Sequence, residues 1–140
     1  MALPDPEPGL VVCYEYLWHR QQTLGATEAE KARPAVIVLI SAETQQVMVA
    51  AITTQEDDRD SIGIPPRVAA HLGLDNTRPS RVVVDEVNYF HWPNDLAQVP
   101  NAPRSRFHYG FLPPRLFETI KQAIVRNHSA DNLAKVKRQP

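Results

Sequence analysis

Two short apolar runs that lie close together in the sequence constrain the fold more than any other feature. The first covers residues 31–40 and the second covers residues 47–54. Both are rich in β-branched residues and too short for a core helix, so they predict buried strands. The polar gap between them has the length of a hairpin connection. The sequence therefore predicts an antiparallel hairpin at the centre of one sheet.

Polar side chains stand at one end of this predicted hairpin. Arg33 opens the first strand, and Thr53 and Thr54 close the second. The start of one antiparallel strand lies beside the end of the next, so we expect the guanidinium and a hydroxyl to meet there. Because neighbouring strand residues point to opposite faces, only one threonine can face Arg33. A planar fork of charged donors beside a hydroxyl suits a phosphate.

The same residues resemble the MazF/PemK toxins of bacterial toxin–antitoxin pairs. In that family an Arg-Pro pair opens a hydrophobic strand, as Arg33-Pro34 does here, and the next strand ends like residues 49–53, Val-Ala-Ala-Ile-Thr. Three further stretches fit in the same order, namely residues 8–12, 71–74 and 82–87. The resemblance covers most of residues 8–126. Two departures are the long insertion 17–32 and Glu86, where the family more often has glutamine.

This resemblance implies both a fold and an activity. The fold would be mostly β with some α, an SH3-like small barrel with a short inserted helix and a C-terminal helix. The activity would be metal-independent endoribonuclease cleavage of single-stranded RNA, in which the 2′-hydroxyl attacks the phosphodiester without a cofactor. Arg33 and Thr53 would be the catalytic residues, because the alignment favours Thr53 over Thr54. The chain would be a homodimer that a cognate antitoxin protein holds inactive, and residues 17–32 would shape base recognition.

Other interpretations of the same barrel stay open. One is a non-catalytic binding module for a protein or RNA partner, and another is a toxin that targets a protein, as CcdB-type gyrase inhibitors do, since a fold alone does not settle function. Arg33 also has a purely structural interpretation, an ion pair with an acid such as Asp85. Asp85 in turn either orients Arg33 for catalysis or caps a turn.

Histidines and aromatic residues offer a second set of candidates. His19 and His91 are the acid–base pair to consider if Arg33 moves no proton, because histidine titrates near neutrality. Trp18 and Trp92 lie beside them, and with Arg20 they are candidates for binding unpaired RNA bases by stacking. The competing interpretation places both tryptophans in the core or at a dimer interface.

Composition limits the remaining function classes. With 140 residues, 43% of them apolar, the chain predicts one globular domain, and 13 prolines favour turn-rich loops. A net charge of −1 predicts no strong general attraction to nucleic acid or membrane. One cysteine and no paired histidines argue against a metal site. No apolar run approaches the roughly 18 residues of a membrane span, and the acidic start is unlike a secretory signal, so we expect a cytoplasmic protein.

The remaining segments complete the expected organisation. We expect an extended arm at 1–8, a single domain at 9–128 and a flexible basic tail at 129–140. The other expected elements are strands at 10–16, 62–64 and 81–87, a continuation or partner strand at 89–92, and helices from 65 to 73 and from 113 onward. We expect loops at 27–31 (mobile, or one helical turn), at 55–61 (acidic and solvated) and at 93–106 (on the surface).

Overall fold

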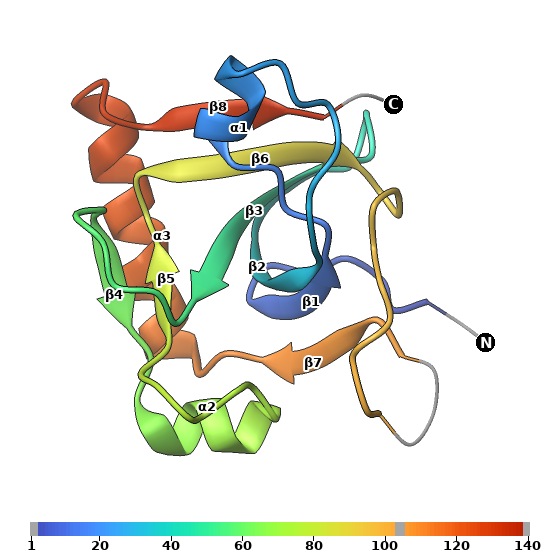
Figure 1. Ribbon diagram of the computed structural model, residues 1–140, viewed down its shortest axis with the longest axis vertical. Coiled ribbons are helices and arrows are strands. Elements are labelled where there is room, and N and C mark those ends of the chain that lie inside the picture. The colour runs from blue at the N-terminus through green and yellow to red at the C-terminus, as the bar shows by residue number, and fades with distance from the viewer. Residues whose placement is uncertain (1–2, 103–105, 139–140) are drawn as a thin grey trace.

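The predicted hairpin forms the middle of the sheet in a computed structural model, which describes residues 3–102 and 106–138 (Figure 1). The elements are β1 (Leu10–Tyr14), α1 (His19–Thr23), β2 (Arg33–Ser41), β3 (Gln46–Thr53), β4 (Ser61–Gly63), α2 (Pro66–Leu72), β5 (Arg81–Val83), β6 (Glu86–His91), β7 (His108–Phe111), α3 (Pro114–Ser129) and β8 (Ala134–Lys137). β2 and β3 pair antiparallel, β1 lies on the other side of β2, and β7 pairs with β1. The central hairpin and the mostly β class are confirmed.

The outer side of β3 is shared by two strands. β6 pairs with the first half of β3, β5 pairs with its end, and β4 lies beyond β5. We expected one strand over residues 81–87, but it breaks at Val84. There the backbone N–H of Val84 donates to the carbonyl of Asp60 at 3.0 Å instead of joining β3. Residues 89–91 belong to β6, the strand that begins at Glu86 after this break.

Both longer helices begin where the sequence predicts, and α2 also ends there. α2 and α3 each carry a proline in the first turn, where a helix needs no backbone N–H. Gly73 ends α2 in the left-handed conformation, with φ of +75°. In the insertion, residues 27–31 contain no helix, which agrees with the first of the two expectations, a loop. The helix α1 at the start of the insertion was not predicted. The Gln21 side chain accepts the Trp18 N–H at 3.1 Å and so stabilises the start of α1.

Both faces of the central strands are buried, which explains why their sequences are continuously apolar. One face packs against α2 and α3 through a cluster that includes Val11, Val36, Ala50, Leu72, Ile120 and Ile124. The opposite face packs a cluster that includes Val12, Tyr14, Tyr16, Trp18, Val49 and Phe90. The second cluster includes Trp18 of the insertion, whose ring lies beside Arg33 at the start of β2.

The expected basic tail is wrong for most of its length. α3 continues to Ser129, and β8 then pairs in parallel with β6. Val136 is fully buried, and the buried Arg138 forms an ion pair with Asp95 at 3.5 Å. A four-residue strand with one inward-facing valine is too short to stand out in a basic sequence. Residues 139–140 lie outside the described part of the chain.

The remaining expectations concern the surface. Residues 3–7 of the expected arm have no regular secondary structure, while residues 1–2 lie outside the described part. Residues 93–102 form the expected long loop, with one bridge between Tyr14 and Leu96, and residues 103–105 are not described. None of the described helices is long and apolar enough to cross a membrane.

Candidate phosphate-binding site

Arg33 and Thr53 lie at the same end of the central hairpin, as predicted. Ala35 faces Ala51 in the register of β2 and β3. Arg33 lies two residues before Ala35, and Thr53 lies two residues after Ala51. Both line a cleft of about 510 Å³. The cleft is enclosed by β2, β3, the segment after α2 and the loop around Asn101. A charged donor and a hydroxyl therefore share one cleft.

Thr53 and Thr54 both line this cleft. β3 ends at Thr53, so strand alternation no longer governs the direction of Thr54. The expectation that only one of the two faces Arg33 stays a prediction. The Thr53 hydroxyl is buried and accepts the backbone N–H of Gln55 at 3.1 Å. That bond uses the oxygen as an acceptor and leaves the hydroxyl hydrogen free to donate to a ligand.

Arg33 is a half-buried cation whose charge is not neutralised. Its Nε is buried without a hydrogen-bond partner in the described part of the chain, where Arg33 also forms no ion pair. Burial lowers the pKa of Arg33, and the positive charges of Arg20 and Arg59 lower it further. Arginine nevertheless stays charged at working pH. An anion that bound here would relieve the repulsion among the three guanidiniums.

These three arginines lie against the indole ring of Trp18. The guanidinium carbons of Arg59, Arg33 and Arg20 lie 4.2, 4.9 and 5.7 Å from the ring centroid. The ring of Tyr16 lies 4.7 Å away on a tilted plane, and Trp18 is only 6% exposed. Little of the ring is free to stack on an RNA base, so the burial favours the competing interpretation of Trp18 as a core residue.

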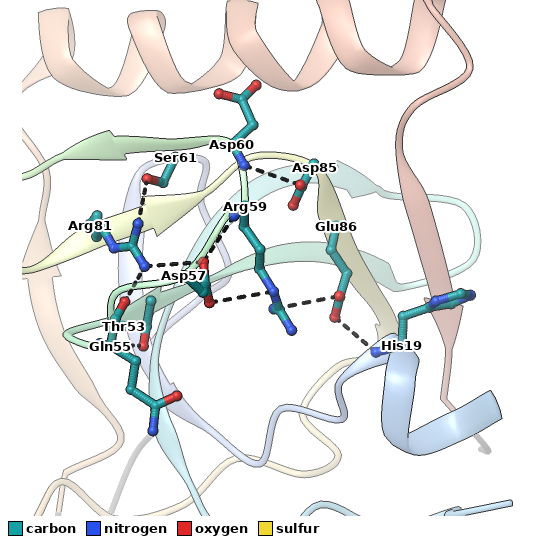
Figure 2. A network of polar contacts seen from close by, with 10 residues as sticks. All are labelled: His19, Thr53, Gln55, Asp57, Arg59, Asp60, Ser61, Arg81, Asp85 and Glu86. Atoms are coloured by element: carbon teal, nitrogen blue, oxygen red, sulfur yellow. Dashed lines mark hydrogen bonds and ion pairs between the residues drawn. The ribbon is translucent and has the colours of Figure 1, made fainter. Parts of the chain in front are cut away.

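Glu86 is the buried carboxylate of this cluster (Figure 2). It forms an ion pair with Arg59 at 3.7 Å and accepts the backbone N–H of His19 at 3.0 Å. Burial raises the pKa of Glu86, and those two partners only partly offset the effect. Burial and the charge of Glu86 also raise the pKa of Tyr16, whose hydroxyl makes no hydrogen bond of normal geometry to any described residue.

The four acidic residues of the loop 55–61 are exposed, as expected, and ion pairs with arginines fix one of them. Asp57 forms ion pairs with Arg81 at 3.2 Å and with Arg59 at 3.6 Å, and Figure 2 shows Arg59 between Asp57 and Glu86. Arg81 also donates to the carbonyl of Gln55. Arg59 was missed in the sequence because acidic residues surround it there.

Asp85 does not approach Arg33. Its carboxylate accepts the backbone N–H of Asp60 at 3.1 Å, which stabilises the turn before β4. Of the two interpretations, the structure supports the turn cap and not the partner of Arg33.

The histidine candidates do not join the site either. His91 pairs with Gln46 at the opposite end of β3 from Thr53. Thr53 lies seven residue steps along the strand from Gln46, which corresponds to about 23 Å. Trp92 follows His91 and packs near Phe90, with ring centroids 6.1 Å apart. The imidazole of His19 points away from Arg59 and Glu86 in Figure 2.

One buried residue that the sequence did not single out holds the insertion in place. Asn88 is fully buried in β6. Its amide nitrogen donates to the Leu17 carbonyl at 2.8 Å, and its oxygen accepts the Leu17 N–H at 3.0 Å and the Tyr14 hydroxyl at 3.3 Å. Asn88 thereby fixes the backbone immediately before Trp18. An asparagine in a strand carries no sequence signal of such a role.

The described residues contain no group of three or more histidine, cysteine, aspartate or glutamate side chains that is arranged to hold a metal ion. The sequence matches neither a model of a known protein family nor a curated protein.

Proposed function

We propose that the chain is a metal-independent endoribonuclease that cuts single-stranded RNA at the Arg33 cleft. The observation that carries the proposal is the unneutralised guanidinium of Arg33, which shares a cleft with the Thr53 hydroxyl. The sequence resemblance to MazF/PemK toxins supports the same activity. On this proposal the fold is an SH3-like barrel, and the protein is a cytoplasmic homodimeric toxin that an antitoxin protein holds inactive.

The proposed reaction is a transesterification within the RNA. The 2′-oxygen attacks the adjacent phosphorus while the bond from phosphorus to the 5′-oxygen breaks, which leaves a 2′,3′-cyclic phosphate and a 5′-hydroxyl. Water takes the proton of the 2′-hydroxyl, and the departing 5′-oxygen takes a proton from water. Arg33 stabilises the negative charge on the non-bridging oxygens, and Thr53 donates a hydrogen bond to one of them.

A non-catalytic binding module for RNA or a protein is the second candidate, and a specific observation favours it. Among the described residues that line the cleft there is no histidine. Burial raises the pKa of Tyr109 and of Cys13 there, so neither acts as a base near neutrality. The same cleft therefore suits binding without cleavage.

Cleavage of mixed-sequence single-stranded RNA in EDTA tests the proposal. We expect cyclic-phosphate ends from the wild type, and about 10²–10³ less cleavage from Arg33→Ala, by analogy with other charge-stabilising donors. Thr53→Ala should also be impaired, while Arg67→Ala, an exposed arginine on α2, is the matched control. Cleavage that survives in a folded Arg33→Ala variant would refute the mechanism. RNA binding without any cleavage would favour the binding module.

A further inference from the structure

Three hollows on the Arg33 face share lining residues and form one groove. A hollow of about 120 Å³ shares Lys31, Arg33 and Gln55 with the central cleft. A wider hollow of about 910 Å³ shares Thr54, Gln55 and Arg78 with the central cleft. Gln55 lines all three. The groove therefore extends from the proposed cleavage position into two further hollows.

Each end of the groove carries exposed positive charge. Arg20 and Lys31 line the small hollow, and Arg78 lines both the central cleft and the wide hollow. None of these three forms an ion pair with a described residue. Arg20 lies against the Trp18 ring, so its guanidinium is partly ordered before a ligand arrives.

The groove also contains carboxylates, but two of them already have donors. Asp57 is paired with Arg59 and Arg81. One oxygen of Asp75 accepts both the backbone N–H of Thr77 at 3.0 Å and its hydroxyl at 2.8 Å. Glu30 and Glu56 also line the groove, and all four acids are exposed. Arg20, Lys31, Arg33 and Arg78, which form no ion pair with a described residue, are thus distributed over the three hollows.

We propose that the groove holds successive phosphates of one RNA strand, with Arg33 on the central phosphate. Arg20 binds the neighbouring phosphate on one side, and Arg78 binds the neighbouring phosphate on the other. This inference rests on the proposed function and extends it, because it assigns the residues that position the strand on either side of the reacting group.

The salt dependence of binding tests these assignments. The probe is a mixed-sequence, 2′-O-methylated RNA oligonucleotide, which cannot be cut by attack of its own hydroxyl, and its affinity is measured by fluorescence anisotropy over a range of NaCl concentrations. For a single strand, each lost contact with a phosphate reduces the slope of log affinity against log salt by about 0.7. We expect Arg20→Gln and Arg78→Gln each to lower the slope by about that amount. The double variant should lower it by about 1.4.

Arg115→Gln, on the exposed start of α3, is the matched control and should leave the slope unchanged. Failure of the inference and failure of the proposed function are distinguishable. Binding that weakens in Arg33→Gln, with an unchanged slope in either Arg20→Gln or Arg78→Gln, would overturn the strand path and leave the Arg33 site intact. If the oligonucleotide does not bind at all, both proposals fail. Binding of polyglutamate instead of RNA would assign the groove to an acidic peptide and also overturn the inference.

A neutral methylphosphonate in place of one phosphate tests the same path from the side of the ligand. In a short oligonucleotide, neutralising the linkage on either side of the central one should weaken binding to the wild type. In Arg20→Gln one of those two linkages should become insensitive to neutralisation, and in Arg78→Gln the other. If the loss of affinity from each substitution and the loss from each neutralised linkage simply add in every combination, the assignment is contradicted.

Discussion

Replacing Asn88 with alanine tests how the candidate site is held together. The substitution removes the side chain that pairs with both backbone groups of Leu17. Because this region is buried, water cannot replace the lost partners. A buried polar group that is left unpaired costs about 1–3 kcal/mol, so the two groups of Leu17 together predict about 2–6 kcal/mol. A domain of this size is stable by about 5–15 kcal/mol, so the loss is a large fraction of the total.

Urea denaturation followed by circular dichroism measures the effect. We expect the midpoint of Asn88→Ala to fall while the slope of the transition stays the same, which indicates lower stability without a change in compactness. Asn94→Ala is the matched control, because Asn94 is exposed, and its change should stay within about 0.5 kcal/mol.

The same substitution should weaken the site as well as the fold. Leu17 immediately precedes Trp18, whose ring contacts the guanidinium of Arg33. Under conditions in which Asn88→Ala remains folded, its affinity for RNA should therefore be lower than that of the wild type. A loss of stability no larger than that of Asn94→Ala would refute the reasoning that Asn88 anchors the insertion.

Three further predictions concern Glu86, β8 and the end of α2. Burial raises the pKa of Glu86 in the folded state, so folded Glu86 binds its proton more tightly than unfolded Glu86. The contribution of Glu86 to the free energy of unfolding is therefore greatest below its unfolded pKa, and it declines as the pH rises through its folded pKa. The free energy of unfolding against pH should show this decline in the wild type, and a decline equally steep in Glu86→Gln would contradict it. In β8, the Ala134 N–H donates to the Asp85 carbonyl at 2.9 Å, so hydrogen exchange should find it protected, whereas a flexible tail would exchange at the rate of an unfolded chain. Gly73→Ala should destabilise the protein by about 1–2 kcal/mol in urea denaturation because Gly73 adopts a positive φ, and a stabilised variant would refute this.

The sequence predicted those parts of the fold that depend on local patterns. The central hairpin, the proline-started helices and the stop at Gly73 follow from β-branched runs and from the conformational preferences of proline and glycine. The approach of Arg33 to Thr53 also follows, because antiparallel pairing determines which strand ends meet. These predictions need no knowledge of tertiary packing.

Features that depend on tertiary contacts were not predictable from the sequence. β8 exists because a single buried valine, Val136, packs beside β6. Arg59 belongs to the site only because the loop 55–61 folds back onto Trp18. The two threonines share a cleft because β3 ends between them, a boundary that sequence patterns do not locate within a residue or two.

The central claim is that the guanidinium of Arg33 binds a phosphodiester. The most direct measurement is the NMR signal of the Arg33 Nε–H during titration with a dinucleotide whose attacking 2′-hydroxyl is replaced by hydrogen. We predict a saturable shift of that signal, because the buried Nε–H has no hydrogen-bond partner among the described residues. The neutral methylphosphonate dinucleotide should produce no such shift. An Arg33 signal that stays unchanged with the charged dinucleotide, or that shifts equally with the neutral one, would contradict the account.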